Sequence, residues 1–233
     1  MDKATAIICV YNEQDTVKDV IITTSLEEHI DEIIVVNDGS SDNSKTIIDS
    51  LKSRYNLTVI HFDQNLGKGH AMTVGVENAS HEIVVFIDAD QTNIVPNYTT
   101  KLIMALVNKE CDMAVGYTTV DFFKMEINIM KILAGERALF KSDIMPILDK
   151  LKESRFGVET LLYFYYISLG KSVKFTKLSG LSHRNKYKKA SFKDATNNYI
   201  GEGWEIVSVA LNHYDLIMAA ARKKIKLGKS VGH

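Results

Sequence analysis

The chain has 233 residues, with 28 lysines and arginines against 29 aspartates and glutamates, so its formal net charge at pH 7 is −1. This length suits one α/β domain with a helical appendage, and the charge balance supplies no global field for binding nucleic acid. No apolar run approaches the roughly 20 residues that cross a bilayer, and no N-terminal signal sequence is recognisable. We therefore expect a cytoplasmic protein in which Cys9 and Cys111 are reduced.

Strand-like and helix-like segments alternate along the first half of the chain. Apolar, β-branched runs predict strands, and amphipathic runs with acidic caps predict the helices between them. The expected strands are 4–10, 32–37, 57–61, 83–88 and 111–116, and the expected helices are 14–28, 42–54, 68–79 and 97–108. This alternation predicts an α/β fold with a mostly parallel central sheet, helices on both faces, and ligands beyond the carboxyl ends of the strands.

Polar clusters follow four of the expected strands. They are Tyr11-Asn12-Glu13, Asp38 to Asp42, Asn65 to Gly69, and Asp88-Ala89-Asp90. Because the carboxyl ends of parallel strands meet at one edge of a sheet, we expect the four clusters to line a single crevice.

Asp88 and Asp90 follow the most apolar of these strands. Carboxylates at positions i and i+2 of an extended chain point the same way, and carboxylate oxygens suit Mg²⁺ or Mn²⁺ that keeps open positions for substrate phosphates. The alternative interpretation is that both aspartates cap a turn or the next helix. The neighbouring polar clusters favour the metal site.

Two further clusters have the chemistry of a nucleotide site. Asp38 can accept hydrogen bonds from a base N–H or a ribose hydroxyl, whereas Asp42 is better explained as a helix cap. Gly67 and Lys68 open a helix whose free N–H groups favour anions, and the lysine adds a charge that can face a phosphate. The chain has neither a Walker loop nor a Gly-x-Gly-x-x-Gly dinucleotide motif after the first strand.

In order and spacing, these clusters resemble family-2 glycosyltransferases with the GT-A fold over about the first 120 residues. One departure is Cys9-Val10, where the family commonly carries a proline before the Tyr-Asn-Glu. The resemblance implies a sugar nucleotide in the crevice, with Asp90 on the metal. It implies donor-binding roles for Tyr11, Asn12, Glu13, Asp38, Gly67, Lys68, Asp88 and Ala89.

The second half resembles two groups within this family. Segment 133–138 resembles the acceptor-side glycine-rich segment of family-2 enzymes. Segments 156–162 and 181–186 are similar to polyprenyl-phosphate glycosyltransferases, which invert the anomeric centre, and to glucosyl-3-phosphoglycerate synthases, which retain it. The resemblance implies that Asp90, Arg137 and Glu159 are catalytic, that His183 is a metal ligand beside Asp90, and that Arg184 and Lys186 gather phosphate oxygens. The alternatives are a helix-dipole partner at Glu159, a loop histidine and a solvated basic run.

We therefore expect a metal-dependent enzyme that moves a sugar from a UDP- or GDP-sugar to a polyprenyl phosphate or another phosphorylated acceptor. One alternative is a retaining enzyme similar to glucosyl-3-phosphoglycerate synthase. Another is a sugar-phosphate nucleotidyltransferase, although that class usually carries a glycine-rich basic loop after its first strand. The non-enzymatic alternative is a nucleotide-sugar-binding module, which the intact acidic pair and His183 disfavour.

The C-terminus has an amphipathic pattern. We expect a GT-A domain over residues 1–200 and an amphipathic helix with a basic tail over 201–233. The apolar stripe consists of Trp204, Val207, Leu211, Tyr214, Met218, Ala221 and Ile225. Such a helix can pack on the domain, form a homodimer contact, or bind peripherally at the inner face of a membrane.

Overall fold

The computed structural model describes residues 2–94, 96–118, 131–154, 157–178 and 180, together with the backbone of 182–183. Its strands are β1 (Ala4–Val10), β2 (Ile30–Asn37), β3 (Thr58–His61), β4 (Ile83–Asp88), β5 (Gln91–Thr92), β6 (Met113–Tyr117), β7 (Arg137–Phe140), β8 (Val173–Lys177) and β9 (Ser182–His183). Its α-helices are α1 (Val17–Thr24), α2 (Ser44–Lys52), α3 (Lys68–Asn78), α4 (Tyr98–Val107), α6 (Lys141–Ile144), α7 (Leu148–Glu153) and α8 (Val158–Leu169), with a 3₁₀ turn at Met145–Ile147.

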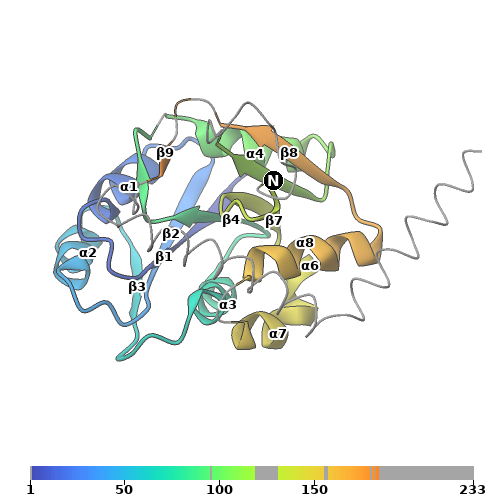
Figure 1. The fold of residues 1–233 in the computed structure, drawn as a ribbon. Coiled ribbons are helices and arrows are strands. Elements are labelled where there is room, and N and C mark those ends of the chain that lie inside the picture. The colour runs from blue at the N-terminus through green and yellow to red at the C-terminus, as the bar shows by residue number, and fades with distance from the viewer. Residues whose placement is uncertain are drawn as a thin grey trace, which may run out of the picture.

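The main sheet contains seven strands in the order β3-β2-β1-β4-β7-β6-β8 (Figure 1). Strands β1 to β4 are mutually parallel. Strand β7 lies antiparallel between β4 and β6, and β8 pairs parallel with β6. Since β1 has β2 on one side and β4 on the other, the strand order reverses at β1. Open α/β sheets bind ligands beyond the carboxyl ends of the strands at such a reversal.

Two hydrophobic cores cover the two faces of the sheet, because alternate residues of a strand point to opposite sides. On β1, Ile8 packs with residues of α1, α2 and α4, whereas Ile7 packs with residues of α3, α7 and α8. The same alternation divides β4, where Val85 faces the first core and Phe86 the second. Figure 1 shows α3, α7 and α8 grouped on one side of the sheet. The expected mostly parallel sheet with helices on both faces is confirmed.

Three details differ from the sequence expectation. Strand β7 was not expected within the sheet, and it is antiparallel to its neighbours. Helix α1 begins at Val17 rather than residue 14, because Glu13 O accepts hydrogen bonds from the N–H groups of Thr16 and Val17 in a tight turn. The short β5–β9 pair was also not expected.

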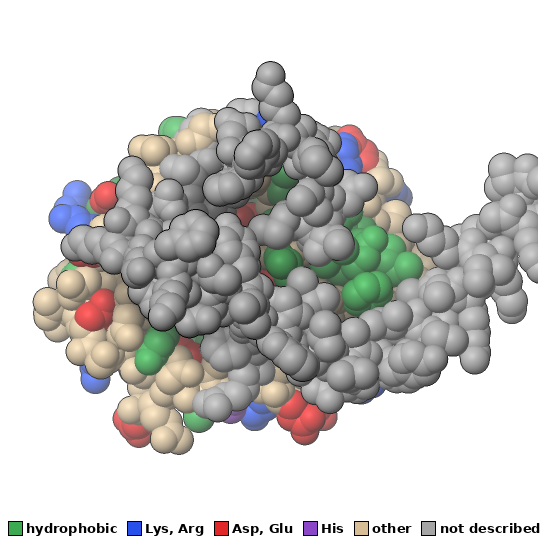
Figure 2. Space-filling model, in the orientation of Figure 1, with side chains coloured by type: hydrophobic (Ala, Val, Ile, Leu, Met, Phe, Trp, Pro, Cys, Tyr) green, Lys and Arg blue, Asp and Glu red, His purple; other side chains and the backbone are tan. Residues whose placement is uncertain are grey.

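The exposed apolar side chains and the lengths of the helices both bear on the predicted membrane contact. Hydrophobic side chains gather over the region of α8 (Figure 2), where Leu169 at the helix end is 46% exposed. Within the described part of the chain, no helix has the length and apolar character to cross a bilayer. The predicted amphipathic helix of 201–233 lies outside the described residues.

Candidate functional site

The loops that follow β1 and β2 are joined by hydrogen bonds at the carboxyl edge of the sheet. Asn12 has a left-handed backbone with φ of 58°, and its N–H donates to Ser40 Oγ at 3.0 Å. Its side-chain Oδ1 accepts from the Ser41 N–H at 2.8 Å. Asparagine tolerates the left-handed region better than most residues. The predicted nucleoside residue Asn12 therefore also fixes the shape of the neighbouring loop.

A second set of hydrogen bonds joins the same two loops through Asp42. Its Oδ2 accepts from the Gln14 N–H at 3.1 Å, and its Oδ1 accepts from the Ser44 N–H at 2.9 Å at the start of α2. Burial acts to raise the pKa of this carboxyl, but the hydrogen bonds from Ser44 and Gln14 outweigh it and hold the pKa below its ordinary value. The Glu13 N–H donates to Ser44 Oγ at 3.0 Å. These contacts agree with the interpretation of Asp42 as a helix cap.

Asp38 holds the loop that leads into α3. Its buried carboxylate accepts the Leu66 N–H at 2.7 Å on Oδ1 and the Gly67 N–H at 2.9 Å on Oδ2. The neighbouring Gly39 has φ of 68°, and a Cβ there would lie 2.3 Å from the backbone carbon of Gln64. The structure thus gives Asp38 a contact that the sequence did not suggest, namely the backbone of the Gly67-Lys68 segment.

Lys68, the first residue of α3, connects two carboxylates. Its Nζ lies 2.7 Å from Asp88 Oδ1 at the end of β4 and 2.6 Å from Glu159 Oε1 in the first turn of α8. Burial acts to lower the pKa of Lys68, but Asp88 and Glu159 outweigh it and raise the pKa well above its ordinary value. The lysine is therefore a fixed cation that joins the first half of the sheet to the second-half helix α8.

The turn that carries Asp88, Ala89 and Asp90 is held on two sides. Thr16 Oγ1 donates to the buried Ala89 carbonyl oxygen at 2.7 Å. On the other side, a Cβ on Gly135 would lie 2.0 Å from Asp88 Oδ2, so only glycine lets that backbone approach the carboxylate. The side chain of Asp90 is half-buried.

Strand β9 brings residue 183 to the same turn. Its backbone pairs with Gln91, the residue after Asp90. Two of the predicted ligands, Asp90 and His183, thus come from segments that lie next to each other. The predicted phosphate contacts Arg184 and Lys186 lie outside the described residues. Within the described residues, no group of three or more histidine, cysteine or acidic side chains forms a metal cluster.

Arg137 is fully buried in β7. Its guanidinium donates to backbone carbonyl oxygens, from Nη1 to Glu159 at 3.1 Å and from Nη2 to Ile132 at 3.1 Å and to Ala134. Burial lowers the pKa of Arg137, while Glu159 and Asp88 act in the opposite direction. In this structure the residue predicted as catalytic holds the 132–136 segment and the start of α8 in place.

The sequence did not predict a buried pair of side chains next to the turn that follows β4, Gln91 and Glu136. Gln91 is fully buried, and its Nε2 donates to the equally buried Glu136 Oε1 at 2.5 Å. Burial, with Glu136 and Glu27, raises the pKa of the adjacent Tyr98 well above its ordinary value. Gln91 directly follows Asp90 in the chain, but no spacing rule relates it to a residue 45 positions later.

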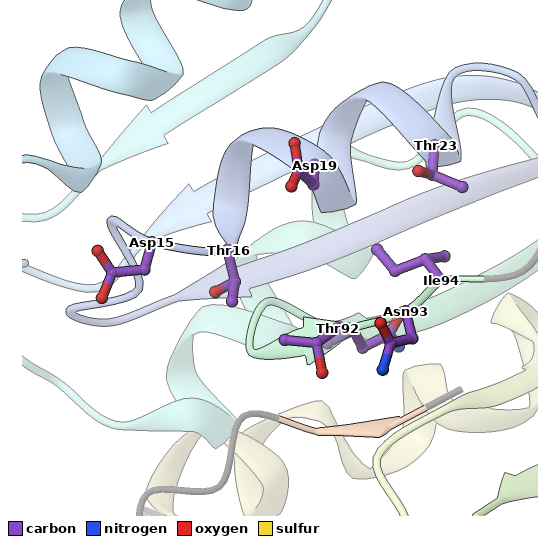
Figure 3. A pocket seen from close by; sticks show the side chains of 8 residues that line it. Asp15, Thr16, Asp19, Thr23, Thr92, Asn93 and Ile94 are labelled. Carbon is purple, nitrogen blue, oxygen red and sulfur yellow. The ribbon is translucent and has the colours of Figure 1, made fainter. Parts of the chain in front are cut away.

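The remaining predicted donor residues differ in exposure. Tyr11 is 48% exposed at the rim of the site, whereas Glu13 is buried. A separate hollow of about 440 Å³ lies between α1 and the turn after β5, and its lining is Asp15, Thr16, Asp19, Thr23, Gln91, Thr92, Asn93 and Ile94. Figure 3 shows this lining, with Asp15, Asp19 and Thr23 on the α1 side and Thr92, Asn93 and Ile94 opposite. Asp38, Lys68 and Asp88 are not part of it.

Comparison with curated proteins identifies partial relatives. Poly-beta-1,6-N-acetyl-D-glucosamine synthase of Staphylococcus epidermidis is 40% identical over 85 residues, which is 36% of this chain and 21% of that protein. The synthase of Staphylococcus aureus (strain MSSA476) is 34% identical over 91 residues, or 39% of this chain and 22% of that protein. The chain thus spans about a fifth of the length of these relatives.

Solved structures with the same fold cover more of the chain. Glucosyl-3-phosphoglycerate synthase from Mycobacterium tuberculosis, in complex with Mn²⁺, uridine diphosphate and glucosyl-3-phosphoglycerate, superposes with a TM-score of 0.68 at 19% identity, covering 88% of this chain and 79% of that one. TarS 1-349 of S. aureus gives a TM-score of 0.58 at 18% identity, covering 76% and 58%. These likenesses establish the GT-A fold.

A family model matches most of the sequence. The model for glycosyl transferase family 2 covers residues 5–167. This range includes the four polar clusters, the Gly135–Arg137 segment and Glu159. The chain belongs to glycosyl transferase family 2.

Proposed function

We propose that the chain is a metal-dependent glycosyltransferase that moves a sugar from a UDP- or GDP-sugar to a phosphorylated acceptor. The observation that carries the proposal is Lys68, whose ammonium lies within 2.7 Å of carboxylate oxygens from Asp88 and Glu159. One cation thereby joins the end of β4, on the proposed donor edge of the sheet, to α8 on the proposed acceptor side. Membership of glycosyl transferase family 2 supports the reaction class.

The donor site is proposed at the carboxyl ends of β1, β2 and β4. The half-exposed Tyr11 ring can stack on a base, and Asn12 and Asp38 hold the loops around it. The M. tuberculosis synthase, which has the same fold, is described with uridine diphosphate and with uridine-diphosphate-glucose. Its fold similarity supports a nucleoside diphosphate in the equivalent crevice here.

The acidic turn fits a divalent cation through Asp90 better than through Asp88. Asp88 Oδ1 accepts from Lys68 Nζ, and the backbone of Gly135 lies against its other oxygen. Asp90 follows in the turn, with residue 183 paired to its neighbour Gln91. One carboxylate with a histidine and donor phosphate oxygens is a suitable ligand set for Mn²⁺ or Mg²⁺. Bound there, the cation would offset charge on the departing nucleoside diphosphate.

The residues of the chain would act mainly by position and charge. Lys68 orients Asp88 and Glu159 and offsets part of their negative charge beside the proposed donor site. The acceptor oxygen attacks the anomeric carbon while the bond from that carbon to the donor diphosphate breaks. When the phosphate oxygen itself attacks, as with polyprenyl phosphate, that oxygen is already negative and no base need remove a proton, whereas attack through the hydroxyl of a phosphoglycerate would need one. In the first case Glu159, held by Lys68, would orient groups rather than accept a proton.

Two phosphorylated acceptors deserve testing. Polyprenyl phosphate is our first choice, from the sequence resemblance of the second half. A phosphoglycerate-like small molecule is the second, because the structural neighbour is described with phosphoglyceric acid. A peripheral membrane contact through the C-terminal segment would suit the first choice, and a homodimer contact is the alternative role proposed for that segment.

A transfer assay with Glu159→Gln tests the acceptor class. Wild-type protein would be incubated with UDP- and GDP-sugars, Mn²⁺, and either polyprenyl phosphate or 3-phosphoglycerate, with products identified by mass spectrometry. With polyprenyl phosphate, whose phosphate oxygen attacks, Glu159→Gln should lose only about tenfold in turnover, since loss of general-base catalysis would cost about 10²–10⁴. A loss in that larger range with polyprenyl phosphate as the proven acceptor would contradict the mechanism. No product with any phosphate acceptor, but transfer to a sugar hydroxyl, would contradict the acceptor class.

A further inference from the structure

We propose that His61, supported by Asp49, is a positioning residue for donor binding: its Nδ1 fixes the Asn37 amide in the orientation that shapes the 38–41 loop. This inference rests on the proposed function, in which the 38–41 loop lies beside the bound nucleoside. His61 is the last residue of β3 and pairs directly with Asn37, the last residue of β2. Neither residue belongs to the donor-binding set predicted from the sequence.

The orientation of the Asn37 amide follows from the loop that it contacts. Asn37 is buried, and its Oδ1 accepts the Ser40 N–H at 3.3 Å. An N–H group must meet the oxygen rather than the nitrogen of an amide. The Nδ2 group of Asn37 must therefore face the other way, where it lies 3.1 Å from His61 Nδ1.

This orientation determines the state of the His61 ring. Because Asn37 Nδ2 is a donor, His61 Nδ1 must accept, and the ring proton must be on Nε2. Nε2 lies 3.0 Å from Asp49 Oδ1 of α2, which accepts that proton. The strand and the helix that pack on β3 are β2 and α2, and they bring Asn37 and Asp49 to the ring. The three side chains thus form one chain of donors and acceptors with a single consistent direction.

The chain of hydrogen bonds continues to the proposed donor site. Ser40, held by Asn37, accepts the Asn12 N–H on Oγ, and Asn12 accepts from Ser41. If His61 Nδ1 no longer accepts, the Asn37 amide loses the partner that fixes its orientation. The Ser40 contact and the left-handed Asn12 turn then lose support. The expected consequence is weaker donor binding without a change in the chemical step.

Two substitutions of His61 separate the two ring nitrogens. His61→Asn puts an amide oxygen where Nδ1 was, so it can still accept from Asn37 although the Asp49 contact is lost. His61→Gln puts its amide where Nε2 was, so it keeps Asp49 and loses Asn37. His81→Gln is the matched control, since His81 Nε2 also lies near an aspartate, 3.4 Å from Asp31, but contacts neither loop.

Titration calorimetry with UDP and with GDP, each in the presence of Mn²⁺, measures the effect. His61→Gln should bind the nucleotide about tenfold more weakly, the usual size of one lost hydrogen bond. His61→Asn and His81→Gln should bind as the wild type does. In steady state, His61→Gln should raise the KM for the donor and leave kcat unchanged. Equal affinity in all variants, or equal weakening in the Asn and Gln variants, would overturn the inference.

Hydrogen exchange of the peptide covering residues 38–42, without nucleotide, gives a second readout that does not depend on the proposed function. His61→Gln should accelerate exchange there, whereas His61→Asn should not. If wild-type protein binds neither UDP nor GDP, the proposed function fails, while this exchange pattern still decides whether His61 supports the loop. Identical exchange in all three proteins would overturn the inference.

Discussion

The loops after β1 and β2 and the segment before β7 are held in place by different means. The two loops are joined by several hydrogen bonds between polar side chains and backbone N–H groups, through Asn12 and Asp42. The 132–136 segment is held largely by one buried guanidinium, which donates to its carbonyl oxygens and to that of Glu159. The difference teaches that one half of the site rests on many small contacts, whereas in the other a single buried guanidinium reaches three carbonyl oxygens.

Breaking the ion pairs that join the end of β4 to α8 through Lys68 should give the largest effect. Lys68→Met removes the cation between Asp88 and Glu159, leaving two carboxylates that repel each other. We expect turnover to fall by about 10²–10³, the range for removing one preorganised electrostatic contact from a site. Steady-state transfer assays measure this loss. Lys45→Met on α2 is the control, and comparable turnover in both variants would show that Lys68 has no role in the reaction.

Removing the Arg137 guanidinium, which holds the 132–136 segment, should lower the stability of the fold before it lowers activity. Arg137→Met keeps most of the side-chain volume but leaves carbonyl oxygens of residues 132, 134 and 159 without their donor. Losing these three hydrogen bonds, one buried and two part-buried, should lower the free energy of unfolding by about 3 kcal/mol. Urea unfolding measures it, with the exposed Arg54→Met as control. An unfolding free energy equal to that of the wild type would mean that the segment does not depend on Arg137.

Removing one contact between the loops after β1 and β2, that of Asp42, should have the smallest effect. Asp42→Ala removes the acceptor for the Gln14 and Ser44 N–H groups, with an expected cost of about 1 kcal/mol, typical of a lost cap. Because the folded pKa of Asp42 lies below its unfolded value, its contribution is present above the unfolded pKa and is lost as the pH falls through the folded pKa.

The pH dependence checks this assignment. Urea unfolding of wild type and Asp42→Ala should differ at pH 7 and converge in acid. A difference that is the same at both pH values would mean that the ionised carboxylate is not the source of the stability.

The sequence predicts the first region better than the second for a physical reason. The elements β1 to α4 follow local patterns, and the polar clusters fall at strand ends, whose meeting at one edge is a consequence of parallel pairing. The contacts of Asp38 with Leu66 and Gly67 show that it holds a loop, while its role in nucleoside binding stays a prediction. His61 was missed although it too ends a strand, because its partner Asn37 lies on the adjacent strand.

The second region depends on contacts between distant residues that leave no pattern in the sequence. The pairs Arg137 with Glu159 and Gln91 with Glu136 are 22 and 45 residues apart. Strand β7 inserts antiparallel between β4 and β6, so neither its place nor its direction follows from the alternation of strands and helices. Arg137 was identified by resemblance alone, and its buried contacts with carbonyl oxygens could not be expected from spacing.

Metal-linked nucleotide binding tests the central claim most directly. Thermal-shift or calorimetric titration would compare UDP and GDP, with and without Mn²⁺, on wild type, Asp90→Asn and the exposed control Asp149→Asn. Nucleotide at 100 times its Kd stabilises the folded state by about 2.7 kcal/mol. We predict that Mn²⁺ strengthens binding of one nucleotide in the wild type and in Asp149→Asn, and that Asp90→Asn loses this enhancement. Binding of neither nucleotide, or an enhancement that survives in Asp90→Asn, would contradict the proposed donor site.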